Sequence, residues 1–498
     1  MNPLKQLAGQ TAIYGLSSVI ARVLNFLLVP FYTRVFTDPA EYGVVNELYA
    51  YFAFLIIILT YGMETAFFRF SSKHKNSDVV FSTSLISLFS TSGLFIILIL
   101  VFYPFLASII GYEQNRTFIL LLGLVLAFDA MVAIPFARLR YMNKALNFAL
   151  IKLFNICVNI FFNLLFLFII PFMLKEGYNI YLLERIYNED FRVGYVFVSN
   201  LLASIFTLGW FLKDIAGARL KFSARLLKSM LHYSFPLLVA GLAGTVNEVI
   251  DRIMLKFRLP AEIEALEQIG IYGANVKIAV FMTLFIQMFR YASEPFFFSQ
   301  EKNKGSTGLY ARVLEYFTIA GVIIFLVISL YLDIFKHIIG SDYHEGVRVV
   351  PVILMGNLML GIYFNLSVWY KLKELTIFGA IFASIGAVVT IGINYFFIPV
   401  YGYMASAWGH LLSYSIMVII SYLIGRHYYP VPYNVKKILF YIFLGIGLYI
   451  LSGMWQMDND LFRFSLNTLL FLIFAIVVII RERSIVKEII KISRKQKS

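Results

Sequence analysis

Arg22 is the residue whose type and position point most directly to chemistry, because it lies near the middle of the first long apolar segment. A charge at that depth of a membrane helix costs about 2.5–3.5 kcal/mol, so its presence needs a reason. Arg22 shares one helical face with three polar residues spaced three or four positions apart: Tyr14, Ser18 and Asn25. The stripe predicts a hydrated cavity in which the guanidinium binds a phosphate or pyrophosphate through its bidentate fork. The alternative is an internal salt bridge that fixes the helices.

A second polar group lies in the apolar segment 233–256. Asn247 and Asp251 share a helical face and are candidates to line the same cavity as Arg22. Glu248 and Arg252 are four residues apart, in the favourable order for an intrahelical ion pair. That pair would be structural, and the segment supports both interpretations.

Three further charges in apolar segments are candidates for gating and ion coupling. Glu47 and Lys277 carry opposite charges 230 residues apart, near the outer ends of their segments, and a salt bridge between them would close an outer gate. The alternative is two independent residues exposed to water at the interface. Asp129 is a candidate proton or sodium site, or a carboxylate held by a neighbouring helix.

Other polar residues have structural interpretations. Glu64 and Glu294 are also 230 residues apart, beside Phe-Phe pairs, which predicts a repeated structural corner at the cytoplasmic face. Asn155, Asn159 and Asn163 form a ladder at four-residue intervals, which interhelical hydrogen bonding explains without a ligand.

The composition shows which elements must position these residues. Of 498 residues, 60% are hydrophobic and 14% charged, with a mean hydropathy of +0.81. Soluble domains carry about 25% charged residues. The apolar residues fall in blocks of about 20, the length that crosses a bilayer. The chain is therefore predicted to be an all-α polytopic membrane protein, with its only cysteine, Cys157, unable to form an intramolecular disulfide.

About fourteen transmembrane helices are expected, because lipid leaves backbone groups no partner outside a helix. The spans are predicted at 10–32, 43–68, 80–105, 117–138, 149–172, 193–212, 233–256, 269–290, 311–334, 347–370, 375–398, 403–425, 438–455 and 464–481. Lys and Arg concentrate in alternate loops, starting with the N-terminal tail, so both termini are predicted to be cytoplasmic, including the basic tail after Arg481. This positive-inside pattern explains the net charge of +14 without nucleic acid. The first span is expected to be retained, because no small-residue cleavage site follows it.

A repeat divides the chain. Tyr42-Gly43 recurs as Tyr272-Gly273, and Tyr61, Glu64 and Phe67-Phe68 recur with the same shift of 230 residues. Six spans per copy is an even number, so both copies enter the membrane in the same direction. The predicted parts are an N-terminal six-helix lobe (1–212), a cytoplasmic linker (213–232), a C-terminal six-helix lobe (233–425), and two further helices with the basic tail (426–498).

The sequence does not favour an enzyme. Its six histidines are scattered, and no His or carboxylate set has metal-ligand spacing. It has no Walker-type glycine-rich loop, so neither ATP nor another cofactor is expected. Energy for transport would come from an ion gradient or from consumption of the substrate on the far side.

In these features the chain resembles the polysaccharide transporter family, the lipid-linked oligosaccharide flippases of the MATE-like MOP superfamily. The resemblance covers about residues 1–480. It rests on these segments: Tyr14–Pro30 with Arg22, Asp38–Gly43, Glu64–Lys75, Ser234-Phe235-Pro236, Asp251-Arg252 and Ile398–Gly402.

The resemblance implies alternating access in the inner (cytoplasmic) membrane. A central cavity lined by spans 1, 2, 7 and 8 would take a polyprenyl-pyrophosphate-linked oligosaccharide from the cytoplasmic leaflet to the outer leaflet. Arg22 and Lys277 are the cations that match its pyrophosphate, while Glu47, Glu248 and Asp251 make the predicted lining mixed in sign. Candidate partners are the lipid-linked oligosaccharide, membrane lipids, a proton or sodium ion, and a polysaccharide polymerase.

Two other functions stay open. An ion-coupled multidrug exporter of the same fold would use acidic cavity residues, although Arg22 disfavours a cationic substrate. A membrane glycosyltransferase or sugar polymerase would need a large outer loop, and the longest here, 173–192, is short.

Overall fold

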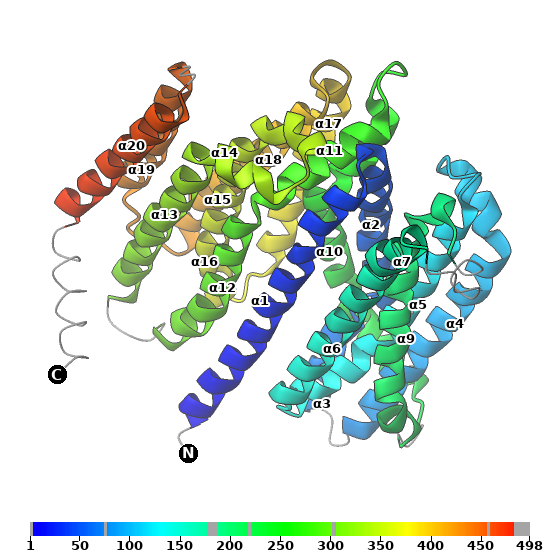
Figure 1. Ribbon diagram of the computed structural model, residues 1–498. Coiled ribbons are helices and arrows are strands. Elements are labelled where there is room, and N and C mark those ends of the chain that lie inside the picture. The colour runs from blue at the N-terminus through cyan, green and yellow to red at the C-terminus, as the bar shows by residue number, and fades with distance from the viewer. Residues whose placement is uncertain are drawn as a thin grey trace, which may run out of the picture. The chain divides into compact units, whose positions relative to one another are not determined.

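The computed structural model describes residues 3–73, 77–177, 187–217, 221–300, 305–455 and 459–482. Every regular element in these ranges is helical (Figure 1), as the composition predicted. Three parts of the earlier predictions lie outside the described residues. They are the side chains of Tyr14 and Ser18, part of the predicted outer loop 173–192, and the basic tail after Glu482.

The first half of the chain forms one run of long helices. They are α1 (Pro3–Val35), α2 (Pro39–Thr60), α3 (Met63–Lys73), α4 (Ser77–Ile109), α5 (Arg116–Tyr141), α6 (Ala145–Leu164), α7 (Ile170–Lys175), α9 (Gly194–Ala216) and α10 (Ala224–Arg258). A π-helical turn, Leu165–Ile169, joins α6 to α7.

The second half continues in the same way. Its elements are α11 (Ala265–Ile278), α12 (Val280–Gln300), α13 (Ser306–Leu330), α14 (Leu332–Phe335), the 3₁₀ segment η4 (Ser341–Val349), α15 (Val350–Leu366), α16 (Val368–Leu372), α17 (Ile377–Tyr401), α18 (Tyr403–Tyr428), α19 (Val435–Met454) and α20 (Asp460–Arg481).

These helices follow the predicted spans in order. Among the described residues, twelve helical segments are long and apolar enough to cross a membrane, and α11 with α12 forms a thirteenth that is broken at Ala279. The helix α1 has 33 residues, about 50 Å at 1.5 Å per residue, and coincides with the first predicted span. Each of the fourteen predicted segments therefore coincides with a helix or a run of adjoining helices.

Two boundaries differ from the prediction in an informative way. Ser223 accepts a hydrogen bond from Leu226 N and caps α10, so this helix begins inside the predicted linker 213–232. The span predicted at 43–68 is divided where Tyr61 and Gly62 adopt positive φ angles of 37° and 69°, which ends α2 before α3 begins.

The chain forms two compact units, each described here by itself. Unit 1 comprises Met1–Lys277, Ile339–Tyr343 and Thr376–Ser413, and unit 2 comprises Ile278–Ile338, His344–Leu375 and Tyr414–Ser498. Unit 1 thus joins the first six predicted spans to parts of the second repeat. The division into lobes at 213–232 stays a prediction from the repeat.

In unit 1, α5 packs between α4 and α9, and α6 packs against both α9 and α1 (Figure 1). The asparagine ladder of α6 makes interhelical hydrogen bonds, which confirms its structural interpretation. Asn155 donates to Thr207 of α9 (2.8 Å), and Asn163 accepts from Tyr32 of α1 (2.8 Å) while donating to the Asn159 carbonyl. In a membrane such bonds stabilise helix association by about 0.6 kcal/mol each.

In unit 2, α13 packs against α12, α15, α19 and α20. Lys437 at the start of α19 lies 2.8 Å from Glu315 of α13 and 2.7 Å from Glu482 at the end of α20. Asn467 of α20 donates to the Leu330 carbonyl at the end of α13 (2.6 Å). The two appended helices are therefore held to α13 at both ends.

Candidate functional site

The first feature of the site is a direct backbone contact in unit 1 between α2 and α11. A Cβ atom on Gly43 would lie 1.8 Å from the Leu266 carbonyl oxygen, and one on Gly270 would lie 1.9 Å from the Pro39 carbonyl oxygen. A Cβ atom on Gly273 would lie 2.5 Å from the side chain of Asn46 of α2, so this glycine packs against a side chain. We call these three residues the glycine contact. The repeated Tyr-Gly pairs of the sequence thus supply the positions where helices of the two repeat copies touch, at the end predicted to be outer.

A buried ion pair lies in the same unit. Glu47 of α2 is fully buried, and Lys256 Nζ of α10 lies 3.0 Å from its carboxylate. Tyr112 OH donates to the same carboxylate (2.6 Å), and Lys256 also donates to the Ile110 carbonyl (2.7 Å). Burial, and then the neighbouring Glu47 carboxylate, raises the pKa of Tyr112, so its hydroxyl stays a donor. These interactions join α2, the loop after α4, and α10.

The expected partner of Glu47 is different in the structure. Glu47 pairs with Lys256, not with Lys277 as the predicted gate required. The 230-residue shift relates equivalent positions in the two copies, whereas the observed partner comes from α10, one span earlier than Lys277.

The end of α1 is fixed to the same unit by the short segment 339–343. The Gly340 N–H donates to Thr33 Oγ1 (3.0 Å), and Tyr343 OH donates to the Phe36 carbonyl (2.7 Å). Asn275 of α11 donates to the Tyr343 carbonyl (2.7 Å). With the glycine contact and the Glu47 ion pair, these bonds form what we call the outer closure.

Three cations of unit 1 lie within electrostatic range of one another at Lys277. The electrostatic neighbours of Lys277 are Arg252, Glu248 and Arg22. Arg22 and Glu248 are exposed in the structure, and Lys277 is half-buried. Within the described ranges, neither Arg22 nor Lys277 makes a hydrogen bond or an ion pair, so the salt bridge offered as an alternative for Arg22 is not formed there. Asn25, one turn along α1, is also exposed. We call Arg22, Arg252 and Lys277 the cation group.

Asn247 is held by another helix. It is buried, its amide donates to the Ala383 carbonyl of α17 (2.9 Å), and its amide oxygen accepts from Thr390 Oγ1 (2.9 Å). Its polar atoms therefore join α10 to α17.

Asp251 is held as well. It accepts from Tyr272 OH of α11 (2.7 Å) and pairs with Arg252 Nη1 (3.2 Å). Arg252 donates to the backbone carbonyl of Glu248 (3.1 Å), and its ion pair is with Asp251. The side chain of Glu248 lies near Lys277 and forms no hydrogen bond or ion pair with the described residues.

Asp129 lies on α5, half-buried, and accepts from Ser204 Oγ of α9 (2.7 Å). Tyr49 and Lys152 lie within electrostatic range of its carboxylate. The bond to Ser204 corresponds to the interpretation of a carboxylate held by a neighbouring helix, and the ion site stays a prediction.

Comparison with known proteins identifies the family. A family model described as "Polysaccharide biosynthesis protein" matches residues 7–301. The chain belongs to this family. No curated protein matches the sequence.

Solved structures show the fold of this polysaccharide biosynthesis protein. The lipid II flippase MurJ, in an inward closed conformation, superposes with a TM-score of 0.72 at 17% identity, covering 95% of this chain and 100% of that one. A MATE protein in the straight conformation gives 0.59 at 14% identity, covering 86% and 96%. An outward-facing multidrug resistance MATE transporter of the MOP superfamily gives 0.58 at 13%, also covering 86% and 96%. The chain shares the fold of these proteins, and its many long apolar helices make it a multi-pass membrane protein.

Two elements of the site in this family member were missed by reasoning from the sequence. Lys256 follows Arg252 by one helical turn near the outer end of its span, and that spacing was the available signal. Gly43 and Gly273 were recognised as members of a sequence repeat, but their contact was not predicted. A repeat shows that two positions are equivalent in the two copies, not that they lie close together in space.

The glycine contact predicts a position-specific effect of a single methyl group. Gly43→Ala should lower the free energy of unfolding of the purified protein by about 1–3 kcal/mol, and its melting temperature with it. The reason is that the new Cβ overlaps a backbone carbonyl that cannot move alone. Gly93→Ala is the matched control: this glycine is also in a helix, and a Cβ there meets nothing within 4 Å. The control should be neutral or slightly stabilising. Equal melting temperatures for both variants would contradict the close contact.

The Glu47 ion pair predicts non-additive stabilities. Lys256→Met should destabilise the protein by about 3–5 kcal/mol, because it leaves a buried carboxylate without its cation. Adding Glu47→Gln to Lys256→Met should restore most of the loss, measured as the melting temperature in detergent. A double variant that loses the sum of both single effects would show that the pair is not coupled.

Proposed function

We propose that this protein is an alternating-access flippase that moves a polyprenyl-pyrophosphate-linked oligosaccharide from the cytoplasmic to the outer leaflet of the inner membrane. The observation that carries the proposal is a pair of cations on helices of the predicted cavity, Arg22 and Lys277, which form no hydrogen bond or ion pair with any residue that the structure describes. Family membership supports a role in polysaccharide biosynthesis, and the fold is shared with transporters.

The cation group suits a pyrophosphate. Cations close together in a low-dielectric region repel each other, and attraction to a bound anion offsets that repulsion. Arg252 is already paired with Asp251, which leaves the guanidinium of Arg22 and the ammonium of Lys277 to bind the ligand. A guanidinium binds phosphate oxygens through two parallel hydrogen bonds, and an ammonium adds a point charge. Asn25 would add an amide contact, and Asn247 and Asp251 would position α10 and α11.

The outer closure supplies the gate. Closure of one end keeps the polar head group from reaching the outer side before the protein rearranges. Release requires that the glycine contact separate and that the Glu47 carboxylate exchange Lys256 and Tyr112 for water. We therefore assign gating to Glu47 and Lys256, and substrate binding to Lys277.

Coupling and topology belong to the same proposal. Asp129 is the candidate site for a proton or sodium ion, and a polysaccharide polymerase is the candidate protein partner on the outer side. Both termini are proposed to be cytoplasmic, from the distribution of Lys and Arg among the loops.

The second candidate is an ion-coupled multidrug exporter. The MATE fold and the exposed Glu248 beside Lys277 favour it. An organic cation would have to bind next to Arg22, Arg252 and Lys277, which costs electrostatic free energy. For that reason the flippase is the better account.

The proposal predicts a selective loss of translocation. Arg22→Ala and Lys277→Ala should each slow the flipping of a fluorescent polyprenyl-pyrophosphate glycan in proteoliposomes by about tenfold or more, because each removes a charge-assisted hydrogen bond. Arg22→Lys should recover only part of the activity, since it keeps the charge but loses the fork.

Arg116→Gln is the control for charge removal, because Arg116 is exposed and, of the residues that the structure describes, bonds only to Glu113 through its carbonyl. It should translocate normally. Normal translocation by Arg22→Ala at equal protein level would exclude this site, and export of an organic cation by the wild-type protein with no glycan flipping would favour the second candidate.

A further inference from the structure

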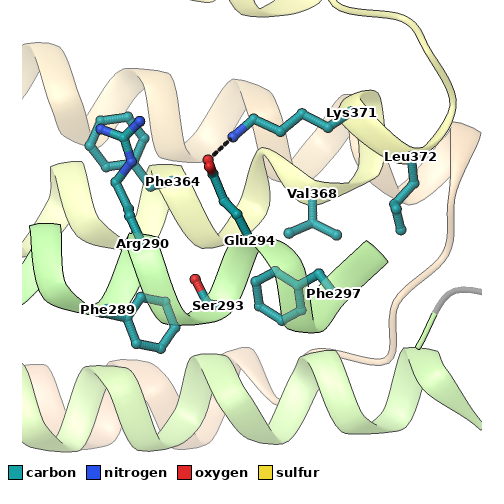
Figure 2. Close-up of a pocket in the computed structure, with 9 residues that line it drawn as sticks. All are labelled: Phe289, Arg290, Ser293, Glu294, Phe297, Phe364, Val368, Lys371 and Leu372. Atoms are coloured by element: carbon teal, nitrogen blue, oxygen red, sulfur yellow. Dashed lines mark hydrogen bonds and ion pairs between the residues drawn. The ribbon is translucent and has the colours of Figure 1, made fainter. Parts of the chain in front are cut away.

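A pocket in unit 2 combines two basic side chains with apolar walls. It lies among α12, α15 and α16, and Figure 2 shows Arg290, Ser293 and Glu294 of α12 facing Phe364 and Lys371. Phe289, Phe297, Val368 and Leu372 complete its lining. We call it the Arg290 pocket. It is separate from the cation group, which belongs to unit 1.

Arg290 has an aromatic neighbour but no acceptor. Its guanidinium lies 4.0 Å from the centroid of the Phe364 ring, a stacking arrangement that fixes the orientation of its fork. No residue in the described ranges accepts a hydrogen bond from Arg290. Ser293 is one turn further along the same face, and its hydroxyl points into the pocket (Figure 2), also without a bond among the described residues. The pocket thus presents oriented donors that the protein itself does not use.

The remaining charges of the pocket leave a net positive value. Lys371 Nζ lies 2.5 Å from Glu294 Oε1, so the carboxylate is neutralised by this ion pair. The ammonium retains two further donors, because Lys carries three. Two cations and one anion give a net charge of +1, which favours an anion beside Arg290 and Lys371.

The first repeat copy shows that this arrangement is not required by the fold. Glu64 occupies the position equivalent to Glu294 and forms its own ion pair, with Arg140. The position equivalent to Arg290 is Thr60, whose hydroxyl donates to the Ile56 carbonyl in its own helix. One carboxylate and one cation complete that corner. Arg290 is therefore an additional cation, present in one copy only and without an acceptor in the described part of the chain.

The position of the pocket indicates the kind of anion. The ends of α12 and α16 lead into the loops 301–305 and 373–376, which the charge distribution predicts to be cytoplasmic. Basic pockets between helices at that side of a membrane bind phosphate head groups of lipids. The five apolar or aromatic walls suit an acyl chain or glycerol backbone, whereas a free inorganic anion would gain nothing from them.

We propose that the Arg290 pocket binds the phosphate of an anionic lipid head group in the cytoplasmic leaflet. Arg290 and Ser293 donate to the phosphate oxygens, Lys371 contributes its remaining donors, and the aromatic side chains cover the apolar part. The proposal does not depend on what the cation group carries.

The test is lipid binding to the purified full-length protein in a non-ionic detergent. Phosphatidylglycerol should raise the melting temperature of the wild-type protein, and phosphatidylcholine should not. Arg290→Gln should weaken the apparent affinity for phosphatidylglycerol about tenfold or more, and Ser293→Ala by less, because a charged donor contributes more than a neutral one. The lipid-free melting temperature of each variant reports whether it folds.

Arg69→Gln is the matched control, since Arg69 also stacks on an aromatic ring, 4.1 Å from the Tyr233 centroid, but lies outside this pocket. It should bind phosphatidylglycerol as the wild type does. Polyprenyl phosphate serves as a second probe: if it alone gives an Arg290-dependent shift, the site is confirmed and its lipid is the carrier lipid. Equal shifts for wild type and Arg290→Gln, or an equal shift with inorganic phosphate, would overturn the proposal.

Discussion

The close approach of two helix backbones is the constraint on which the rest of unit 1 depends. Gly43 and Gly270 bring α2 and α11 so near that each faces a carbonyl of the other helix. The Glu47 carboxylate on the same helix α2 is fully buried, and its bonds to Lys256 and Tyr112 stabilise it there. The glycines and the ion pair therefore stabilise one another's position, and a change in either weakens the outer closure as a whole.

The polar residues of this membrane protein divide into two groups by their bonds. Those that other helices hold, such as Asn247, Asp251 and Asn163, satisfy one another and fix the packing. Those without an acceptor among the described residues, Arg22 and Lys277, keep their charge available. Since an unpaired charge in a membrane is costly, we propose a hydrated cavity that receives an anionic ligand as the reason for these two cations. This distinction, and not charge alone, supports the assignment of a binding site.

The sequence predicted the helices and their order because hydrophobic length is a strong and local signal. It also predicted that the asparagine ladder bonds between helices. The pairing of Glu47 was wrong, because a repeat relates Glu47 to Lys277 by equivalence and carries no information about which charges meet. The division into two compact units could not be predicted from the sequence either, because unit 1 combines segments that are far apart in the chain, such as Met1–Lys277 and Thr376–Ser413. Asn247 and Asp251 were predicted to line the cavity, and the structure shows that both bond to neighbouring helices, which the sequence could not indicate.

The central claim is that the outer closure must open in every transport cycle. The most direct measurement is a reversible cross-link across it, using Asn46→Cys and Gly273→Cys, because a Cβ on Gly273 would meet the Asn46 side chain at 2.5 Å. Cys157 is exposed and would be replaced by serine. The account predicts that the oxidised protein binds but does not flip the lipid-linked glycan, and that reduction restores flipping. Undiminished flipping by fully cross-linked protein would contradict it.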